Sequence, residues 1–395
     1  MHDSGNTVHI LVVDDEPDLE LLIRQRFRRK LRDREIFFIF AADGAEALEI
    51  IDRGEQLDLI LSDINMPVMD GLTFLARLQE RGRDDLKTII VSAYGDMGNI
   101  RTAMNRGAFD FVTKPIDFDD LEITMEKTLQ HVRELRRAEA DRRELDRMNR
   151  ELEVAERIQQ AIIPTAFPPF PGHNTFALYA EMLPAQQVGG DFYDYFLLDD
   201  RTLVFAVADV AGKGVPAALI MSATRALLKA EAARQPSPGA CLGAINIHLA
   251  QENMSSMFVS LFLGRLDVRE GIFRYASAGH SMPFLLSGTQ TRQIPRARGA
   301  VLGVDMQSRY EDCDMALEAN DLLFLCTDGI TEAFNAEKEE YGDLRLQALL
   351  ASLGRQDVRE LVHAVIGDVK QYAGSASQSD DMTAMALRFQ GLRRS

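Results

Sequence analysis

The chain of 395 residues is poor in the features that mark several large protein classes. Its three cysteines, Cys241, Cys313 and Cys326, are scattered among apolar residues without metal-ligand spacing, so we expect small buried hydrophobic side chains in a reducing compartment. No uninterrupted apolar run approaches about 20 residues, and no basic region precedes an apolar stretch at the start. We therefore expect no membrane span and interpret the chain as cytoplasmic. Acidic residues outnumber basic residues, and the net charge is −17. This charge argues against nucleic-acid binding, because a protein binds phosphate backbones through a basic face.

The residues that are present indicate a soluble protein with two or three globular domains. Hydrophobic residues make up 46% of the chain and charged residues 27%, and the length exceeds that of one ordinary domain. Changes in the sequence pattern predict three parts, which are residues 1–120, 121–165 and 166–395.

The first part has the pattern of an α/β domain. From Val8 to about Phe118, short β-branched runs alternate with helical stretches; the runs are HILVV, DLILSD, TIIVSA and DFVTK. This alternation is typical of a parallel sheet covered by helices on both faces.

The middle part predicts one long helix from about Asp119 to Ile163, because this stretch contains neither glycine nor proline. Its apolar residues are spaced by three and four, which places them on one face; they are Leu145, Met148, Leu152, Ala155, Ile158 and Ile162. The stripe favours a short coiled coil, and a surface helix packed on its own domain is the alternative.

The third part is rich in predicted strands and turns after the helix breaker Pro164. Apolar runs such as TLVFAVADV, MFVSLFLGRLD and DMTAMALRF alternate with turn signals, and helical stretches lie at Val215 to Ala233 and Leu344 to Leu353. We expect an α+β domain with layered sheets and helices.

Polar side chains in the first part stand where its predicted strands end. They are Asp14, Asp15, Asp63, Ser92 and Lys114. Because the carboxyl ends of parallel strands meet at one edge of the sheet, we expect these side chains to share one pocket. Neighbouring carboxylates of this kind suit Mg²⁺, and a carboxylate beside that ion can attack a phosphoryl group while an ammonium and a hydroxyl bind it.

These residues resemble the receiver domain of two-component systems, through the motifs VVDDEP, LSDINMPVMDG, VSAYGD and FVTKP. The resemblance covers nearly the whole first part and implies a doubly wound, five-stranded parallel sheet. It also implies that Asp63 is phosphorylated by a sensor histidine kinase, and that Asp15, Asp63 and the Asn65 carbonyl bind Mg²⁺, with Asp14 acting through water.

By the same resemblance, Ser92 and Phe111 form the switch pair of the receiver, and Lys114 acts with them. Taken on its spacing alone, Phe111 is better explained as an ordinary core residue of a strand.

Acidic residues in the third part also stand at the ends of apolar strands, beside small residues. They are Asp191, Asp209, Asp328, Asp380 and Asp381. The GKG sequence at 212–214 lacks the spacing of a nucleotide-binding P-loop, and His280 has no second histidine or cysteine at ligand spacing, which argues against zinc. A site of carboxylates and carbonyls favours Mg²⁺ or Mn²⁺.

Six motifs in order resemble the sporulation and general-stress branch of the PPM phosphatase superfamily, from about Thr175 to Phe389. They are GGDFYDYF, ADVAGKGVPAAL, FVSLFLG, YASAGHSMP, LCTDGITEAFN and DDMTAMAL. The resemblance implies a β-sandwich flanked by helices, with two Mg²⁺ or Mn²⁺ ions between the sheets and in-line attack by a metal-bound water on a phosphoester.

The same resemblance implies a role for each acidic position. Asp209 bridges the two metals, while the Val210 carbonyl and Asp191 complete the first coordination shell. Asp328 and Asp380 hold the ions from the far side, with Asp381 as the adjacent alternative.

Together, the motifs predict a response regulator in which phosphorylation of Asp63 controls a metal-dependent protein serine/threonine phosphatase, with the helix as the connection. The resemblance implies a phosphorylated anti-sigma-factor antagonist as substrate and a homodimer formed through the helix. The alternative is a catalytically silent scaffold that binds a partner under receiver control. A DNA-binding regulator is disfavoured by the acidic balance.

Overall fold

The structure is a computed structural model that describes residues 7–83, 85–93, 95–170, 172, 174–251 and 257–391. It divides into two compact units, Met1–Arg147 and Met148–Ser395, with the division inside one helix. The predicted boundaries at residues 120 and 165 lie on either side of this division and stay predictions.

The first unit is a five-stranded parallel sheet in the order β2-β1-β3-β4-β5. Its strands are β1 (Val8–Val13), β2 (Ile36–Ala41), β3 (Leu59–Asp63), β4 (Lys87–Ala93) and β5 (Asp110–Lys114). Its helices are α1 (Pro17–Arg26), α2 (Arg28–Arg32), α3 (Gly44–Asp52), α4 (Gly71–Glu80), α5 (Met97–Asn105) and the first turns of α6 (Phe118–Ile162).

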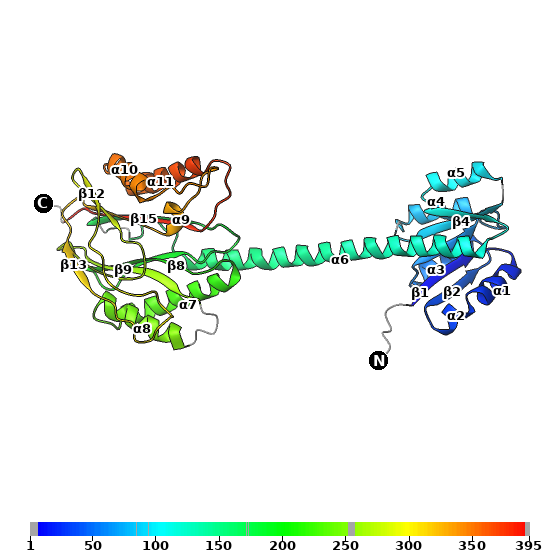
Figure 1. Cartoon of the computed structure of the whole chain (residues 1–395), viewed down its shortest axis with the longest axis horizontal. Coiled ribbons are helices and arrows are strands. Elements are labelled where there is room, and N and C mark those ends of the chain that lie inside the picture. Colours follow the sequence, from blue (N-terminus) through cyan, green and yellow to red (C-terminus); the bar gives the residue numbers. More distant parts are fainter. Residues whose placement is uncertain are drawn as a thin grey trace. The chain divides into compact units, whose positions relative to one another are not determined.

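Helices cover both faces of this sheet (Figure 1). Alternate residues of β1 point to opposite sides: Ile10 packs in the cluster that includes Ile23 of α1 and Met125 of α6, whereas Leu11 packs with Phe74 of α4. The continuous β-branched runs are therefore explained by burial on both faces, and the predicted doubly wound α/β fold is confirmed.

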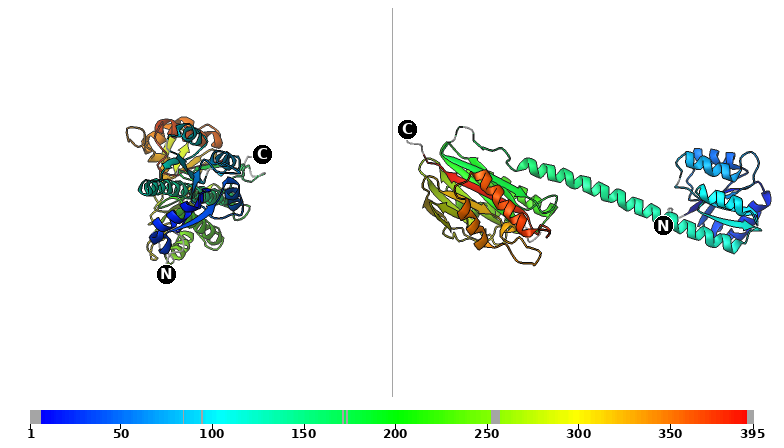
Figure 2. Two further views of the ribbon diagram at one scale, coloured as in Figure 1. Left: turned by 90° about the vertical axis from the view of Figure 1, so that its right-hand side faces the viewer. Right: turned by 90° about the horizontal axis from the view of Figure 1, so that it is seen from above.

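The helix α6 runs from Phe118 to Ile162 without interruption, close to the predicted bounds, as the second view of Figure 2 shows. The side chains of Leu145, Met148 and Ile158 are 58%, 53% and 59% exposed. The alternative in which this stripe packs on its own domain therefore fails for these three residues, whereas Leu152, Ala155 and Ile162 are partly buried.

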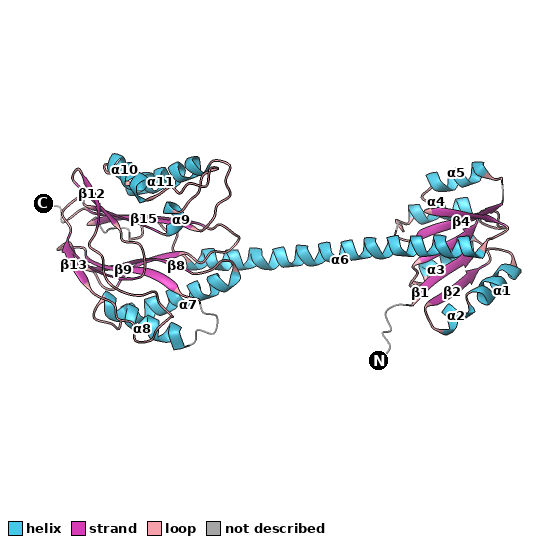
Figure 3. Cartoon of the chain, in the orientation of Figure 1, coloured by secondary structure: helices cyan, strands magenta, loops and turns pink. Residues whose placement is uncertain are grey.

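The second unit contains two five-stranded antiparallel sheets, which Figure 3 distinguishes from the helices by colour. One sheet has the order β13-β10-β9-β8-β7, and the other β12-β11-β14-β15-β6. The strands are β6 (Phe176–Leu183), β7 (Phe192–Leu197), β8 (Thr202–Val210), β9 (Val259–Asp267), β10 (Ile272–Ala278), β11 (Phe284–Ser287), β12 (Gln290–Gln293), β13 (Cys313–Ala316), β14 (Leu322–Cys326) and β15 (Met382–Phe389).

Helices flank the two sheets to give four layers (Figure 1). They are α7 (Val215–Ala232), α8 (Pro238–Gln251), α9 (Asp328–Thr331), α10 (Asp343–Leu353) and α11 (Val358–Ala373). The core between the sheets contains Phe205, Phe262 and Phe273, and separate apolar clusters lie under α7 with α8 and under α10 with α11. This confirms the predicted β-sandwich flanked by helices.

Two further predictions, which concern the burial of the cysteines and membrane-spanning helices, can be compared with the fold. Cys241 and Cys326 are buried, but Cys313 is only partly buried, because it lies on the outermost strand of its sheet. Among the helices that the structure describes, none combines the length and apolarity needed to cross a bilayer.

Candidate functional sites of the two units

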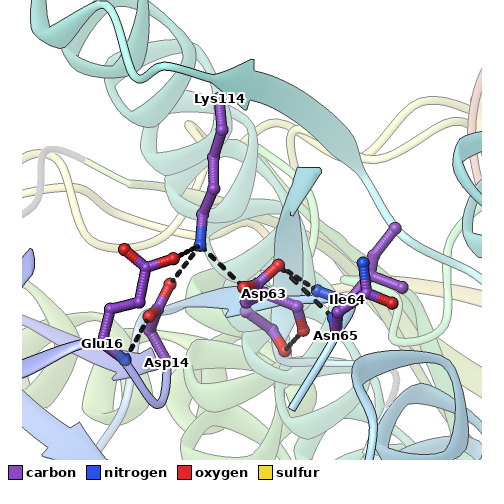
Figure 4. Close-up of polar contacts among 7 residues, drawn as sticks. Asp14, Glu16, Asp63, Ile64, Asn65 and Lys114 are labelled. Carbon is purple, nitrogen blue, oxygen red and sulfur yellow. Dashed lines mark hydrogen bonds and ion pairs between the residues drawn. The ribbon is translucent and has the colours of Figure 1, made fainter. Parts of the chain in front are cut away.

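The first site lies at the carboxyl edge of the parallel sheet, where Lys114 contacts three carboxylates (Figure 4). Its Nζ atom lies 2.7 Å from Asp63 Oδ2, 2.9 Å from Glu16 Oε1 and 3.1 Å from Asp14 Oδ2. The strands β1, β3 and β5 thus bring together residues that are up to 100 positions apart in the sequence.

Asp63 ends the buried strand β3, and its side chain is fixed by the turn that follows. Its Oδ1 atom accepts hydrogen bonds from the backbone N–H of Ile64 at 2.6 Å and of Asn65 at 3.5 Å. The backbone at Gly71 packs directly against Asp63, because a Cβ atom at Gly71 would lie 2.1 Å from the Asp63 carbonyl oxygen. The other oxygen of the Asp63 carboxylate faces Lys114.

Burial and charge act against each other in this pocket. Burial raises the pKa of Asp14, and the hydrogen bonds from the Glu16 N–H and from Lys114 lower it only in part. Burial alone would lower the pKa of Lys114, but its hydrogen bonds to Asp63, Glu16 and Asp14 outweigh this and raise it. Lys114 is therefore firmly protonated and partly offsets the crowded carboxylates.

The carboxylates of Asp14, Glu16 and Asp63 offer oxygen atoms within 4.8 Å of one another, which is a donor set suited to Mg²⁺. Asp15, which we predicted as a ligand, is exposed and lies outside this group. Glu16 was missed by the sequence analysis. The signal was the third acid of VVDDEP, which stands at the N-terminus of α1 and so turns back toward the sheet edge.

The two predicted switch residues differ in burial. Ser92, on β4, is fully buried, and its hydroxyl has no hydrogen-bond partner in the part of the chain that the structure describes. Phe111, on β5, is 37% exposed, so the alternative of an ordinary core residue is wrong.

The second site lies between the two sheets of the sandwich, and Asp191 connects them. Asp191 directly precedes β7, and its Oδ2 atom accepts hydrogen bonds from the hydroxyls of Thr327 and Thr383, both at 2.7 Å. Thr327 directly follows β14 and Thr383 lies on β15, and both of these strands belong to the opposite sheet. The three residues therefore bring the ends of both sheets together.

Four predicted acidic residues are close enough to perturb one another. Burial, together with the charges of Asp328 and Asp380, raises the pKa of Asp209 to about 7. Burial and the charge of Asp209 likewise raise the pKa of Asp191, and burial with the charge of Asp380 raises that of Asp328. Mutual repulsion of this kind is relieved by divalent cations.

Glycines allow the backbone to close around these carboxylates. A Cβ atom at Gly190 would lie 2.9 Å from the Val210 carbonyl oxygen, and one at Gly329 would lie 1.9 Å from the Asp381 carbonyl oxygen. Because such contacts do not fit a side chain, these two positions require glycine. The Val210 carbonyl thus faces the loop that carries Asp191.

The adjacent acids Asp380 and Asp381 have different surroundings. Asp381 is buried, and its two carboxylate oxygens accept N–H hydrogen bonds from Ala185 and Gly190, both at 2.7 Å. Asp380 is half-exposed, and its Oδ2 atom lies 3.1 Å from Nζ of Lys213, the lysine of the GKG sequence. Asp381 therefore holds the loop before β7, whereas Asp380 faces the site.

His280 is structural, as its isolation in the sequence indicated. Its Nδ1 atom lies 2.8 Å from the hydroxyl of Ser260, its backbone bonds Ser277, and burial lowers its pKa to about 4. It is therefore neutral at physiological pH.

Comparisons with known proteins support both domains. A family model described as "Response regulator receiver domain" matches residues 10–126, and one described as "Stage II sporulation protein E (SpoIIE)" matches residues 199–390. Phosphoserine phosphatase RsbU of Bacillus subtilis (strain 168) is 31% identical over 242 residues, which cover 60% of this chain and 70% of RsbU. The chain belongs to the RsbU family of PP2C-type phosphatases.

Two further relatives cover the units separately. Sporulation initiation phosphotransferase F of Bacillus subtilis (strain 168) is 33% identical over 121 residues, which cover 30% of this chain and 92% of that protein. The solved SiaA-PP2C domain of Pseudomonas aeruginosa has a TM-score of 0.56 and 25% identity, and it covers 62% of this chain and 98% of that domain. This RsbU-family protein is thus a response regulator, with a receiver domain followed by a metal-dependent protein serine/threonine phosphatase domain.

The donor atoms of the RsbU-family domain fit divalent metals. Asp209 lies close to other carboxylates, and the Val210 carbonyl lies beside Gly190; hard oxygen atoms of this kind suit divalent metals. The sequence analysis did not identify Thr327 and Thr383. Both lie inside the quoted motifs LCTDGITEAFN and DDMTAMAL, but no spacing rule connects them to Asp191, which is 136 and 192 residues away.

Proposed function

We propose that this protein converts phosphorylation of Asp63 by a sensor histidine kinase into a change in the rate at which its phosphatase domain dephosphorylates a partner protein. In the receiver, Lys114, which contacts Asp63, would bind a phosphoryl group on that residue, and buried Ser92, whose hydroxyl has no partner among the described residues, would donate a hydrogen bond to it. Asp14, Glu16 and Asp63 would hold Mg²⁺ there, and Asp15 and Asn65 are further candidate ligands.

In the phosphatase domain, two Mg²⁺ or Mn²⁺ ions would be held by Asp209, Asp191, the Val210 carbonyl, Asp328 and Asp380. We prefer Asp380 to Asp381 because both oxygens of Asp381 already accept backbone hydrogen bonds. When bound, the ions supply an activated water for attack on the phosphoester and neutralise charge on the transferred group. The residues of the chain fix the ligand geometry, with Thr327 and Thr383 orienting Asp191.

The observation that carries this proposal is the crowding of Asp209 by other carboxylates. A carboxyl whose pKa is raised to about 7 by burial and by neighbouring acids is unfavourable for stability alone and is typical of a functional site. A silent scaffold has no need for this arrangement.

The proposed substrate is a phosphoserine or phosphothreonine on an anti-sigma-factor antagonist, because the relative RsbU is a phosphoserine phosphatase and the resemblance to the general-stress branch implies that target. We also propose that two copies associate through the exposed stripe of α6, since apolar side chains at three- and four-residue spacing suit a coiled coil.

The test is phosphate release from phosphoserine peptides and from a phosphorylated antagonist, with Mn²⁺, with Mg²⁺ and with a chelator. Activity should require metal and should be lost in Asp209→Ala, whereas Asp200→Ala, at an exposed acid in the turn before β8, should behave as wild type. The assay is repeated after treatment with a small phosphodonor, with Asp63→Asn as the control for the receiver. Absence of turnover with either metal, even after Asp63 is phosphorylated, would favour the scaffold.

A further inference from the structure

The side chain of Gln159 joins the last turn of α6 to the loop before β7. Its Nε2 atom donates a hydrogen bond to the Gly189 carbonyl at 2.6 Å, and its Oε1 atom accepts one from the Gly189 N–H at 3.1 Å. Gln159 is 5% exposed, although its neighbours Ile158 and Gln160 are exposed. The carboxamide thus forms hydrogen bonds with both the N–H and the carbonyl of Gly189, which are the two backbone groups that a neighbouring β-strand could otherwise pair with.

The loop that Gln159 holds carries the proposed metal ligand Asp191. Gly189 packs so closely on Asp381 that a Cβ atom would lie 2.3 Å from its Oδ2 atom, and the next residue, Gly190, donates its N–H to the same oxygen at 2.7 Å. The segment from Gly189 to Asp191 is therefore held between Gln159 on one side and Asp381 on the other.

Two further contacts tie the chain after α6 to the strand after Asp191. The hydroxyl of Tyr193 donates to the Pro164 carbonyl at 3.0 Å, and the hydroxyl of Tyr195 donates to the Ala166 carbonyl at 2.9 Å. Ile163 is buried in the core between the two sheets. The end of α6 is thus attached on both sides of Asp191.

We propose that Gln159 is a positioning residue that sets the place of Asp191 and thereby the metal affinity of the phosphatase site. It is the point at which the position of α6 acts on that site. The inference rests on the metal assignment made under the proposed function. Glutamine is suited to the task because its carboxamide has both a donor and a strong acceptor, whereas glutamate lacks the donor when ionised and methionine has no donor and only a weakly accepting sulfur.

The loss of these bonds leaves a buried N–H and a buried carbonyl of Gly189 without partners, which favours movement of the loop. The variant Gln159→Met keeps the length of the side chain and removes both bonds. The matched control is Gln160→Met, because Gln160 is exposed and bonds only to Glu156 of the same helix, at 3.0 Å, among the contacts that the structure gives for it.

The test uses the full chain after chelator treatment and titrates Mn²⁺ by calorimetry. We expect Gln159→Met to bind Mn²⁺ about tenfold more weakly, equivalent to about 1.4 kcal/mol, and to exchange the amide hydrogens of residues 188–191 faster than wild type. Gln160→Met should match wild type in both measurements. Thermal unfolding without metal measures any purely structural cost, which by itself would leave the affinity of the folded protein unchanged.

Wild-type Mn²⁺ affinity and wild-type amide exchange in Gln159→Met would overturn the inference and leave the proposed function intact. If Gln159→Met does not fold, Gln159→Glu replaces it, because it keeps the bond from the Gly189 N–H. An affinity of Gln159→Glu equal to wild type would then overturn the inference, and a weaker one would support it. A wild-type chain that binds no Mn²⁺ would instead overturn the metal assignment, and this inference with it.

Discussion

Asp194 provides a test of whether a buried ion pair stabilises the phosphatase domain. Its side chain is fully buried on β7, with Oδ2 lying 3.0 Å from Arg225 Nε and 3.7 Å from Lys229 Nζ, both on α7. It also accepts a hydrogen bond from the Tyr195 N–H at 2.9 Å. A buried ion pair of this kind either stabilises the folded domain strongly or gains too little attraction to offset the desolvation penalty of its two charges.

The direction of the pKa shift decides between these outcomes. Burial raises the pKa of Asp194, and the charges of Arg225 and Lys229 lower it only in part. The folded protein therefore binds this proton more tightly than the unfolded chain does. The contribution of Asp194 to stability is fully present below the unfolded pKa of about 3.9, and it is lost as the pH rises through the raised folded value.

Replacement of the charge should therefore cost little at neutral pH. We expect Asp194→Asn to unfold within about 1 kcal/mol of wild type, because Asn keeps the volume and the acceptor for the Tyr195 N–H. We expect Asp194→Ala to lose about 2–3 kcal/mol, because it leaves that buried N–H unpaired and a small space behind. At about 2–4 °C per kcal/mol, the two variants should be easily distinguished.

Calorimetric unfolding of both variants, followed through the transition of the phosphatase domain at about pH 7 and about pH 4, provides the measurement. The Asn variant should gain stability relative to wild type between the lower and the higher pH. A loss of about 3–5 kcal/mol in Asp194→Asn at neutral pH, as expected for a broken favourable pair, would refute the reasoning.

Three further predictions concern the metal site and the helix. Gly190→Ala would place its Cβ 2.9 Å from the Val210 carbonyl oxygen and should lower the rate of phosphate release about tenfold or more, since small displacements of active-site groups are costly. The control Gly243→Ala, on α8, should keep the wild-type rate because no atom lies within 4 Å of the added Cβ, and equal losses of rate in the two variants would contradict the prediction. Mn²⁺ at about 100 times its Kd should stabilise the phosphatase domain by about 2.7 kcal/mol in calorimetric unfolding, and an unchanged transition would exclude a tight site. Leu152→Lys should abolish self-association in sedimentation experiments, because a charge in the stripe opposes helix pairing; an unchanged oligomeric state would remove α6 as the interface.

The fold was largely predictable from the sequence because each domain carries a strong local signal. Strands of the parallel sheet are buried on both faces, so β1, β3 and β4 appear as continuous β-branched runs. The long helix was predictable because no glycine or proline interrupts α6. The four-residue helix α9 (Asp328–Thr331) was not predicted, since about one helical turn is too short to show a periodic pattern of apolar residues.

The acidic residues of both sites were predictable as a set, but their individual surroundings were not. Asp14, Asp15 and Glu16 are adjacent in the sequence, and only the turn into α1 determines that Asp14 and Glu16 face Lys114. Asp380 and Asp381 are likewise indistinguishable by type, and only the backbone N–H groups of Ala185 and Gly190, about 190 residues away, occupy the oxygens of Asp381. Gln159 was missed because a glutamine in a polar helix has no distinguishing local pattern.

The two acidic sites differ in how the protein itself balances their charge, and this difference argues for different dependence on divalent ions. In the receiver, Lys114 contacts all three carboxylates and is held in the protonated form, so much of the repulsion is already offset. In the phosphatase domain, Lys213 lies at the edge of the site beside half-exposed Asp380, and the pKa of Asp209 remains raised to about 7. Because repulsion that Lys213 offsets only in part favours metal binding, chelation should perturb the phosphatase domain more than the receiver.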